Sequence, residues 1–532
     1  MKTILFGLDG ATYTILEPLM EDGIMPNLKR FRDEGAACEL ESTAMPITPQ
    51  AWTTLATGVT AGVHGFNDFV RCESSKDGVF FRVNDSRDIH SPTIWEIASQ
   101  AGRQVTVLNY IGTAPPKPIH GHSIPGFTSG RHMRRSSFPS DLFQHLAEIP
   151  GLDAAKLGLD YDIEQLALQT MEPGRWREWI EHHIEREQVW FAVMKHLMTT
   201  DPSDLTAIVL DGVDKIQHLA YRLIDPKYRP GSPSPWEAEM IDLCRSYYAQ
   251  VDRFLGELMQ LVGPWARIVI ASDHGFTATT EVVYINKWLS DQGWLTWRGE
   301  VEEDNKQAVF SDRMVDLANG IDLPRTKAYA LTPSCNGIFI NVEADQYESF
   351  REELITKLTT LRGPDGGQII SDAKKREDVF AGPYMHRAPD LTLTLRDHGL
   401  ISVLNASTAV IPRSEVAGTH HPHGILIARG PGILAGKHLQ LRNILDVTPL
   451  LMHSLGLNIP AHFQGRHPSA FYDPSYLASD PVRWEASSAT ASDDADVLHT
   501  NTTTEAFPDD VELDENEEAI VWERLKSLGY VE

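Results

Sequence analysis

Short apolar runs alternate along this chain with longer stretches of helical character. Five of the runs have the length and the near-continuous Val, Ile and Leu content of strands buried on both faces. They are Thr3–Leu8, Gln104–Asn109, Leu205–Leu210, Arg267–Ala271 and Gly424–Ala428. Helices are predicted at Pro26–Glu34, Pro173–Leu197 and Ala238–Leu261. The alternation predicts an α/β fold, in which helices cover both faces of a doubly wound, mostly parallel sheet.

Two stretches interrupt this alternation. Residues 112–204 are rich in loops and then helical, and residues 279–389 carry a small α/β pattern of their own, with a strand at Gly337–Val342. We predict that both stretches are insertions that form a cap over the edge of the sheet. The predicted core is then divided into three parts, residues 1–111, 205–278 and 390–479.

The last part of the chain, residues 480–532, differs in composition from the rest. It is rich in Ser, Thr and Asp, and the acidic residues between positions 493 and 518 are interrupted by no Lys or Arg. This composition predicts a disordered linker. The linker leads to a short amphipathic segment, Ala519–Leu528, which is predicted to dock as a helix.

Charge and cysteine content narrow the class of protein. The formal net charge of −27 argues against a nucleic-acid polymer or an anionic membrane as a partner. The four cysteines lack CxxC spacing, so neither a disulfide framework nor a cysteine metal site is predicted. No apolar run approaches the roughly 18–20 residues of a membrane span, and no basic-then-apolar leader precedes the first strand. We therefore expect a cytoplasmic protein, and the sequence leaves its oligomeric state open.

The first chemical signal follows the first predicted strand, which ends in Asp9. A carboxylate in this position lies at the carboxyl edge of an open α/β sheet, where such folds bind their ligands. A hydroxyl residue, Thr48, follows in a segment flanked by Pro46 and Pro49. Taken alone, Thr48 is equally well explained as an N-cap or turn residue.

Three further motifs lie next to predicted strands. Asp214 and His218 come after the third strand, and at i and i+4 of a helix they lie about 5–6 Å apart at Cβ, close enough to share one metal ion. Asp273 and His274 come directly after the fourth strand. Three histidines precede the last strand: His420, His421 and His423.

Each motif alone has an ordinary structural explanation, but together they predict a metal centre. Three carboxylates and three imidazoles can hold two divalent cations with a total charge of +4 − 3 = +1, and an ionised Thr48 would make the site roughly neutral. A bound divalent cation lowers the pKa of a coordinated oxygen, which would turn Thr48 into a nucleophile for a phosphorus or sulfur centre. Mixed Asp/His ligation favours zinc, and manganese or iron would also be accepted.

In this order, the motifs resemble the alkaline phosphatase superfamily, and specifically its type I phosphodiesterase/nucleotide pyrophosphatase-like branch. The resemblance spans nearly all of residues 1–475 and is most specific from Thr48 through Thr57-Gly58 to His64-Gly65. It implies an alkaline-phosphatase-like α/β/α sandwich. It also implies a two-metal phosphohydrolase that acts through a phosphothreonine intermediate on a small phosphodiester or nucleotide-like substrate.

The resemblance further implies how the ligands divide between the two ions. One ion would be held by Asp9, Thr48, Asp273 and His274. The other would be held by Asp214, His218 and His420, with His421 and His423 as alternatives to His420.

Substrate contacts are less clearly marked. Eukaryotic-type phosphodiesterases of this superfamily place an Asn five residues after the His of His-Gly, to bind a phosphoryl oxygen. Here that position is Phe69, so Asn67 is the candidate for the contact. Arg71, Lys215 and Arg387 are positions from which a cation could reach the substrate, although residues of this kind are more often on the surface.

Other functions remain as alternatives. A phosphomonoesterase or a phosphonate hydrolase of the same superfamily would use the same ligands. A sulfatase is disfavoured, because no cysteine lies in a C/S-x-P-x-R motif. The alternative from another class is a non-catalytic, metal-stabilised binding or scaffold protein, in which Thr48 would have no chemical role.

Overall fold

A nine-stranded sheet forms the centre of the computed structural model, which describes residues 1–75, 78–128, 130–160, 163, 173–298, 320–332 and 334–486. Its strands are β1 (Thr3–Leu8), β2 (Ala36–Glu41), β5 (Val105–Tyr110), β6 (Gly121–Pro125), β7 (Leu205–Leu210), β8 (Arg267–Ala271), β16 (His423–Arg429), β17 (Lys437–His438) and β18 (Arg442–Asn443). The order across the sheet is β17-β2-β16-β8-β1-β7-β5-β6, and β18 also pairs with β2. All five strands predicted from apolar runs are present in this sheet.

The sheet is mixed and mostly parallel, which confirms the predicted fold class. β1 runs parallel to both of its neighbours, β7 and β8, and β5 runs parallel to β6 and β7. β16 runs antiparallel to both β8 and β2. The amino end of β16 therefore lies at the edge where the parallel strands end. The apolar pattern did not identify β2, because Glu39 and Glu41 interrupt it on the exposed face.

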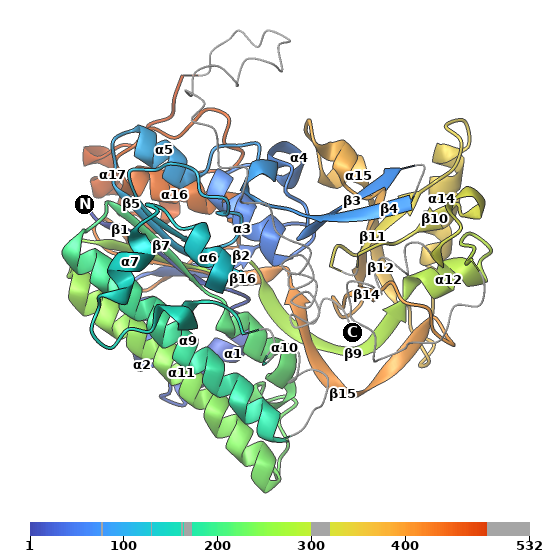
Figure 1. Cartoon of the computed structure of the whole chain (residues 1–532), viewed down its shortest axis with the longest axis horizontal. Coiled ribbons are helices and arrows are strands. Elements are labelled where there is room, and N and C mark those ends of the chain that lie inside the picture. The colour runs from blue at the N-terminus through green and yellow to red at the C-terminus, as the bar shows by residue number, and fades with distance from the viewer. Residues whose placement is uncertain are drawn as a thin grey trace.

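Helices cover both faces of this sheet (Figure 1). One face packs against α1 (Tyr13–Glu21), α2 (Pro26–Asp33), α9 (Pro173–Thr200), α10 (Gly212–Ile224) and α11 (Pro235–Val262). The other face packs against α3 (Thr48–Thr57), α5 (Ile94–Gln100) and α16 (Val447–Ser454). The three helices predicted from the sequence correspond to α2, α9 and α11. In the described part of the chain, no helix is both long enough and apolar enough to cross a bilayer.

Alternation along β1 explains how one strand serves two cores. Ile4, Phe6 and Leu8 belong to the core under α9 and α11, whereas Leu5 belongs to the core under α3. Gly7 lies on the α3 side, and a Cβ added there would come within 2.7 Å of the Trp52 ring. The lack of a side chain at Gly7 therefore lets Trp52 approach the strand that ends in Asp9.

A small lobe lies beside the central sheet (Figure 1). Two long antiparallel strands lead to it, β9 (Gly275–Tyr284) and β15 (Val410–His421), with the short β14 (Ile401–Ser402) paired to β9. The lobe contains a four-stranded sheet in the order β10 (Ala328–Tyr329), β11 (Gly337–Ile340), β13 (Leu391–Leu395) and β12 (Ile370–Lys375), together with α12 (Ile285–Asp291) and α14 (Tyr347–Leu358). β11 is the strand predicted at Gly337–Val342.

Shorter elements complete the chain. They are the hairpin β3 (Val70–Ser75) and β4 (Gly78–Val83), and the helices α4 (Ala61–His64), α6 (Gly130–Arg135), α7 (Leu142–Ala147), α15 (Arg376–Val379) and α17 (Pro474–Ser479). The boundaries of the two predicted insertions stay predictions. Of the predicted linker and terminal helix, the part from residue 487 onward lies outside the described residues.

Candidate two-metal site

The first group of predicted ligands lies where β1 and β8 end. Asp9 follows β1, and Asp273 and His274 follow β8. One ligand atom from each of these side chains lies within 4.8 Å of the other two, and all three side chains are buried. Because β1 and β8 are parallel neighbours, their carboxyl ends meet at the same edge of the sheet and bring these residues together.

The second group comes from α10 and β15. α10 begins at Gly212, directly after β7, and carries Asp214 and His218 one turn apart on the same face. His420 lies near the end of β15. The ligand atoms of Asp214, His218 and His420 again lie within 4.8 Å of one another. His420 reaches this edge because β16, which follows it, enters the sheet in the direction opposite to the parallel strands.

The structure places His420, rather than its neighbours, in this group. Side chains alternate between the two faces of a strand, so His421 points away from the face that His420 occupies. The ring of His421 packs against His398, with 4.6 Å between ring centroids. His423 Nδ1 lies 3.7 Å from a carboxylate oxygen of Glu39.

Each of the three carboxylates keeps one buried oxygen that makes no hydrogen bond in the structure. These oxygens are Asp9 Oδ1, Asp214 Oδ1 and Asp273 Oδ2. For two of the residues the second oxygen is held: Asp9 Oδ2 accepts from Trp52 Nε1 at 3.2 Å, and Asp273 Oδ1 accepts from Gly10 N at 3.1 Å. An unpaired buried carboxylate oxygen is costly, so the three oxygens fit a site that takes cations.

Two histidines face these oxygens with unprotonated nitrogens. Nδ1 of His274 lies 3.1 Å from the carbonyl oxygen of the next residue, and Nδ1 of His420 lies 2.6 Å from the carbonyl oxygen of Pro46. A carbonyl only accepts, so each Nδ1 carries the proton and each Nε2 keeps a lone pair. His274 Nε2 lies 3.2 Å from Asp273 Oδ2, and His420 Nε2 lies 3.2 Å from Asp214 Oδ1. Tetrahedral zinc ligands with bonds of about 2.0–2.1 Å have similar separations, so both groups fit metal ions.

The pKa values of the candidate ligands show how burial and neighbouring charges act on them when no cation is present. Burial, and then the charges of Asp273 and Asp214, raise the pKa of Asp9 well above its usual range. Burial also raises the pKa of Asp273 and lowers the pKa values of His274 and His420. The imidazoles of His274 and His420 are therefore held neutral, as metal ligands must be, and Asp9 and Asp273 need positive charge nearby to be ionised.

Thr48 lies beside the first group. It is the first residue of α3 and follows the N-cap residue Ile47, and no side chain caps this helix. The explanation of Thr48 as an N-cap is therefore wrong. Thr48 is 1% exposed, and its Oγ1 lies 3.5 Å from His274 Nε2. The amino end of α3, with the partial positive charge of its backbone N–H groups, thus lies at the site.

Several supporting residues were not predicted from the sequence. Ser42 Oγ donates to the backbone carbonyl of Asp273 at 2.5 Å, and Gln217 Nε2 donates to the carbonyl of Gly10 at 2.8 Å. A serine in a loop and a glutamine in a helix are common surface residues. Nothing in the sequence pattern distinguishes Ser42 and Gln217 from such residues. They hold the backbone next to the ligands, and only the fold brings them close to it.

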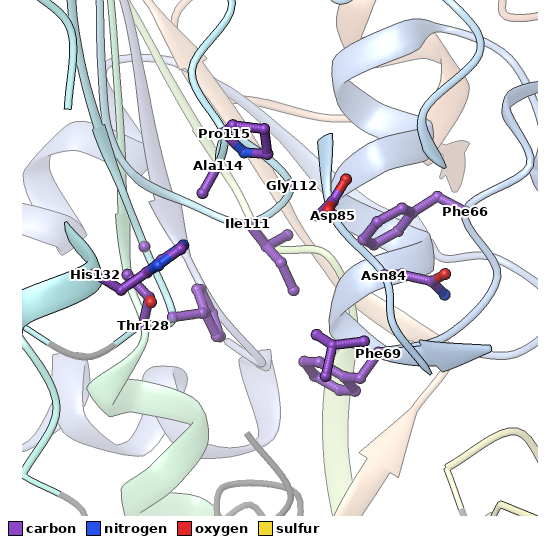
Figure 2. A pocket seen from close by; sticks show the side chains of 13 residues that line it. Phe66, Phe69, Asn84, Asp85, Ile111, Gly112, Ala114, Pro115, Thr128 and His132 are labelled. Atoms are coloured by element: carbon purple, nitrogen blue, oxygen red, sulfur yellow. The ribbon is translucent and has the colours of Figure 1, made fainter. Parts of the chain in front are cut away.

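Asn67 lies close to α3 but in neither ligand group. Its backbone carbonyl accepts from Gln50 Nε2 at 3.3 Å, and its buried Oδ1 makes no hydrogen bond in the structure. The neighbouring Phe66 and Phe69 line a separate apolar cavity of about 90 Å³, with Ile111 and Thr128 on the opposite side (Figure 2). These rings line a cavity near α3, whereas Trp52 is fully buried in the core.

A buried polar network holds the start of α10. Arg186 of α9 donates from Nη1 to Asp211 Oδ1 at 2.6 Å and from Nη2 to Asn109 Oδ1 at 3.2 Å. Asn109 Nδ2 donates to the same Asp211 oxygen at 2.9 Å, and Glu187 Oε1 accepts from the backbone N–H of Gly212 at 2.8 Å. The network therefore fixes the turn from which α10 presents its two metal-ligand candidates.

We expect Arg186→Met to destabilise the protein by about 3–5 kcal/mol, because it leaves the buried carboxylate of Asp211 without its guanidinium partner. Both side chains of this pair are at most 1% exposed, so water does not replace the lost partner. Urea unfolding of the variant and the wild type measures the loss. A loss below about 1 kcal/mol would contradict the assigned role of the pair.

Glu187→Gln is expected to have a different effect. Burial, and then the charge of Asp211, raise the pKa of Glu187 from 4.5 to about 8, so the wild-type side chain is protonated at neutral pH and glutamine resembles it. A raised folded-state pKa means that the wild type loses stability as pH rises from about 4.5 to about 8, by up to roughly 1.4 kcal/mol per pH unit. The variant lacks this group, so its stability relative to the wild type should rise over that range. Unfolding free energies measured from pH 5 to pH 9 test this, and parallel pH profiles would contradict it.

The class of fold is shown by similarity to solved structures. The structure is similar to murine ectonucleotide pyrophosphatase/phosphodiesterase 5, with a TM-score of 0.53, 14% sequence identity, and coverage of 89% of this chain and 100% of that chain. It is similar to phosphonoacetate hydrolase from Sinorhizobium meliloti 1021, with a TM-score of 0.53, 18% identity, and coverage of 86% and 96%. These similarities show the alkaline-phosphatase-like fold predicted from the motifs. A search of curated protein sequences found no match.

The family follows from the sequence itself. The model of the type I phosphodiesterase/nucleotide pyrophosphatase family matches residues 3–424. The chain belongs to this family of hydrolases, within the alkaline phosphatase superfamily. The matched segment contains all six Asp and His residues of the two candidate metal sites.

Proposed function

We propose that the protein is a two-metal phosphodiesterase or nucleotide pyrophosphatase that acts through a phosphothreonine intermediate. Its substrate would be a small phosphodiester or a nucleotide-like compound. The observation that carries this proposal is the position of the Thr48 hydroxyl, buried at the amino end of α3 and 3.5 Å from His274 Nε2 in the first ligand group. A scaffold protein would have no need for a hydroxyl in this place.

In this proposal each residue has a defined task. Asp9, Asp273 and His274 hold one divalent cation together with Thr48, and Asp214, His218 and His420 hold the other. The bound ions supply positive charge that favours the ionised hydroxyl and stabilises the oxygens of the phosphoryl group. Zinc suits these ligands, as do manganese and iron.

The reaction has two covalent steps. Thr48 Oγ1 releases its proton to solvent and forms a bond to phosphorus, while the bond from phosphorus to the leaving oxygen breaks and its electron pair goes to the leaving group, which takes up a proton from solvent. Water then forms a bond to phosphorus, the bond from phosphorus to Thr48 Oγ1 breaks with its electron pair going to Oγ1, and one proton of the water protonates Oγ1. The amino end of α3 faces the developing negative charge through both steps.

Hydrolysis of bis(p-nitrophenyl) phosphate and of p-nitrophenyl phosphate by metal-reconstituted protein tests the proposal. We expect the diester to be the better substrate, because a monoanion is repelled less than a dianion by a protein of net charge −27. A preference for the monoester would make the protein a phosphomonoesterase of the same superfamily. Two bound ions without turnover of either ester would favour the scaffold alternative.

A further inference from the structure

Trp52 contacts the first ligand group from within the core. Its side chain is fully buried, and its indole N–H donates to Asp9 Oδ2 at 3.2 Å. The other oxygen of this carboxylate, Asp9 Oδ1, makes no hydrogen bond in the structure and lies 3.6 Å from His274 Nε2. Because the indole only donates, this contact occupies one oxygen of Asp9 and leaves the other for a cation.

Core packing holds the indole in this place. Gly7 of β1 has no side chain, and a Cβ added there would come within 2.7 Å of the Trp52 ring. The Tyr110 ring makes a T-shaped contact with the indole, with 5.4 Å between ring centroids. The Tyr110 hydroxyl also donates to the backbone carbonyl of Trp52 at 2.7 Å. Closely packed side chains turn little, so the indole N–H stays on Asp9 Oδ2.

Trp52 also connects the candidate nucleophile to the first ligand group. Thr48 and Trp52 are residues i and i+4 of α3, so they lie one turn apart on the same face of the helix. Thr48 Oγ1 lies 3.5 Å from His274 Nε2, and Trp52 Nε1 lies 3.2 Å from Asp9 Oδ2. Two side chains of α3 thus reach two residues of the same group. The helix therefore fixes the hydroxyl of Thr48 relative to the carboxylate of Asp9.

We propose that Trp52 is a positioning residue for the first ion, the one that Asp9, Asp273 and His274 would hold. It determines which oxygen of Asp9 binds the ion, and it fixes the ion relative to Thr48. This inference rests on the proposed function and adds a residue to it. Among the six Asp and His ligand candidates of the described chain, Trp52 makes a hydrogen bond to Asp9 alone. Its effect should therefore be confined to the first ion.

Zinc titration in competition with a chromophoric chelator tests the proposal. We expect Trp52→Phe to weaken one of the two binding steps of the metal-free protein by about 10–100-fold, the usual cost of losing a partner of a metal ligand, and to leave the other step within about threefold. Two variants identify the weakened step. His420→Ala should bind only the first ion. Asp273→Asn should bind only the second, because it replaces the unpaired Oδ2 by an amide nitrogen and keeps the oxygen that accepts from Gly10 N. Trp52→Phe should lower affinity in the His420→Ala background alone.

The matched control is Trp95→Phe, the same change in the same aromatic cluster. The Trp95 ring packs against Tyr110, with 4.7 Å between ring centroids, and belongs to α5 rather than α3. This variant should retain both zinc affinities of the wild type. A second probe, 3-benzothienylalanine incorporated at position 52, keeps the size of the ring and replaces only the indole N–H by sulfur. It should show the same selective loss as Trp52→Phe. Thermal melting of the metal-free proteins reports on folding.

Three results would overturn this inference and leave the proposed function intact. They are an equal loss of affinity at both steps in Trp52→Phe, an equally large loss in Trp95→Phe, and an unchanged affinity for the first ion when 3-benzothienylalanine replaces Trp52. The first two would show that Trp52 only contributes to the stability of the core. Absence of zinc binding by the wild type would instead contradict the proposed function on which the inference rests.

Discussion

Replacement of the single hydroxyl at position 48 should abolish turnover and leave the fold and the metal content in place. We expect Thr48→Ala to lower kcat on bis(p-nitrophenyl) phosphate by about 10³–10⁶-fold, the range found when a nucleophile is removed from other hydrolases. The effect is large because the variant loses the atom that would form the bond to phosphorus. It loses none of the six Asp and His ligand candidates.

The fold should tolerate this change. Thr48 is buried, and it is the first residue of α3, after the N-cap residue Ile47. Thr48→Ser is the matched variant, because it keeps the hydroxyl and removes only a methyl group. We expect it to retain measurable turnover and to form a covalent phosphoenzyme that mass spectrometry detects. If Thr48→Ala kept more than about a tenth of the wild-type rate with its two ions bound, the phosphothreonine mechanism would be wrong.

Much of the central sheet could be predicted from the sequence, since strands buried on both faces leave a strong apolar signal. The predicted bounds of the first, third and fourth strands coincide with β1, β7 and β8. β2 was missed, because its two glutamates resemble surface sequence. The direction of β16 could not be predicted either. It depends on β15 returning from the small lobe, which is a long-range feature of the chain.

The sequence also indicated most of the candidate ligands of the metal site. Asp214 and His218 follow from helical spacing, and Asp9 and Asp273 follow from their places after buried strands. Spacing alone could not choose among His420, His421 and His423, and only the fold shows that His420 and His421 lie on opposite sides of β15 and that His423 begins β16. Arg186 gave no sequence signal, because an arginine in a long polar helix is usually exposed. The identity of the metal ligands themselves stays a prediction.

Removal of the metal ions should have the second large effect on stability and turnover. Metal-reconstituted wild type should bind two divalent ions per chain, as measured by elemental analysis after gel filtration. Each ion binds the folded state in preference to the unfolded chain, so a concentration 100-fold above its Kd stabilises the protein by about 2.7 kcal/mol. A chelator should therefore lower the melting temperature and stop turnover together. An unchanged melting temperature after complete metal removal would contradict the view that the three unpaired carboxylate oxygens are there for cations.

A pair of adjacent histidines tests which residues hold the second ion. His420→Ala removes a nitrogen that faces Asp214 Oδ1 at 3.2 Å, so we expect one ion per chain and a loss of turnover. His421→Ala is the matched control, because that ring lies on the other face of β15 against His398. It should retain two ions and most of the activity. If His421→Ala lost one ion and His420→Ala kept both, the metal ligand would be His421 on the other face of β15. The grouping of His420 with Asp214 and His218 would then be wrong.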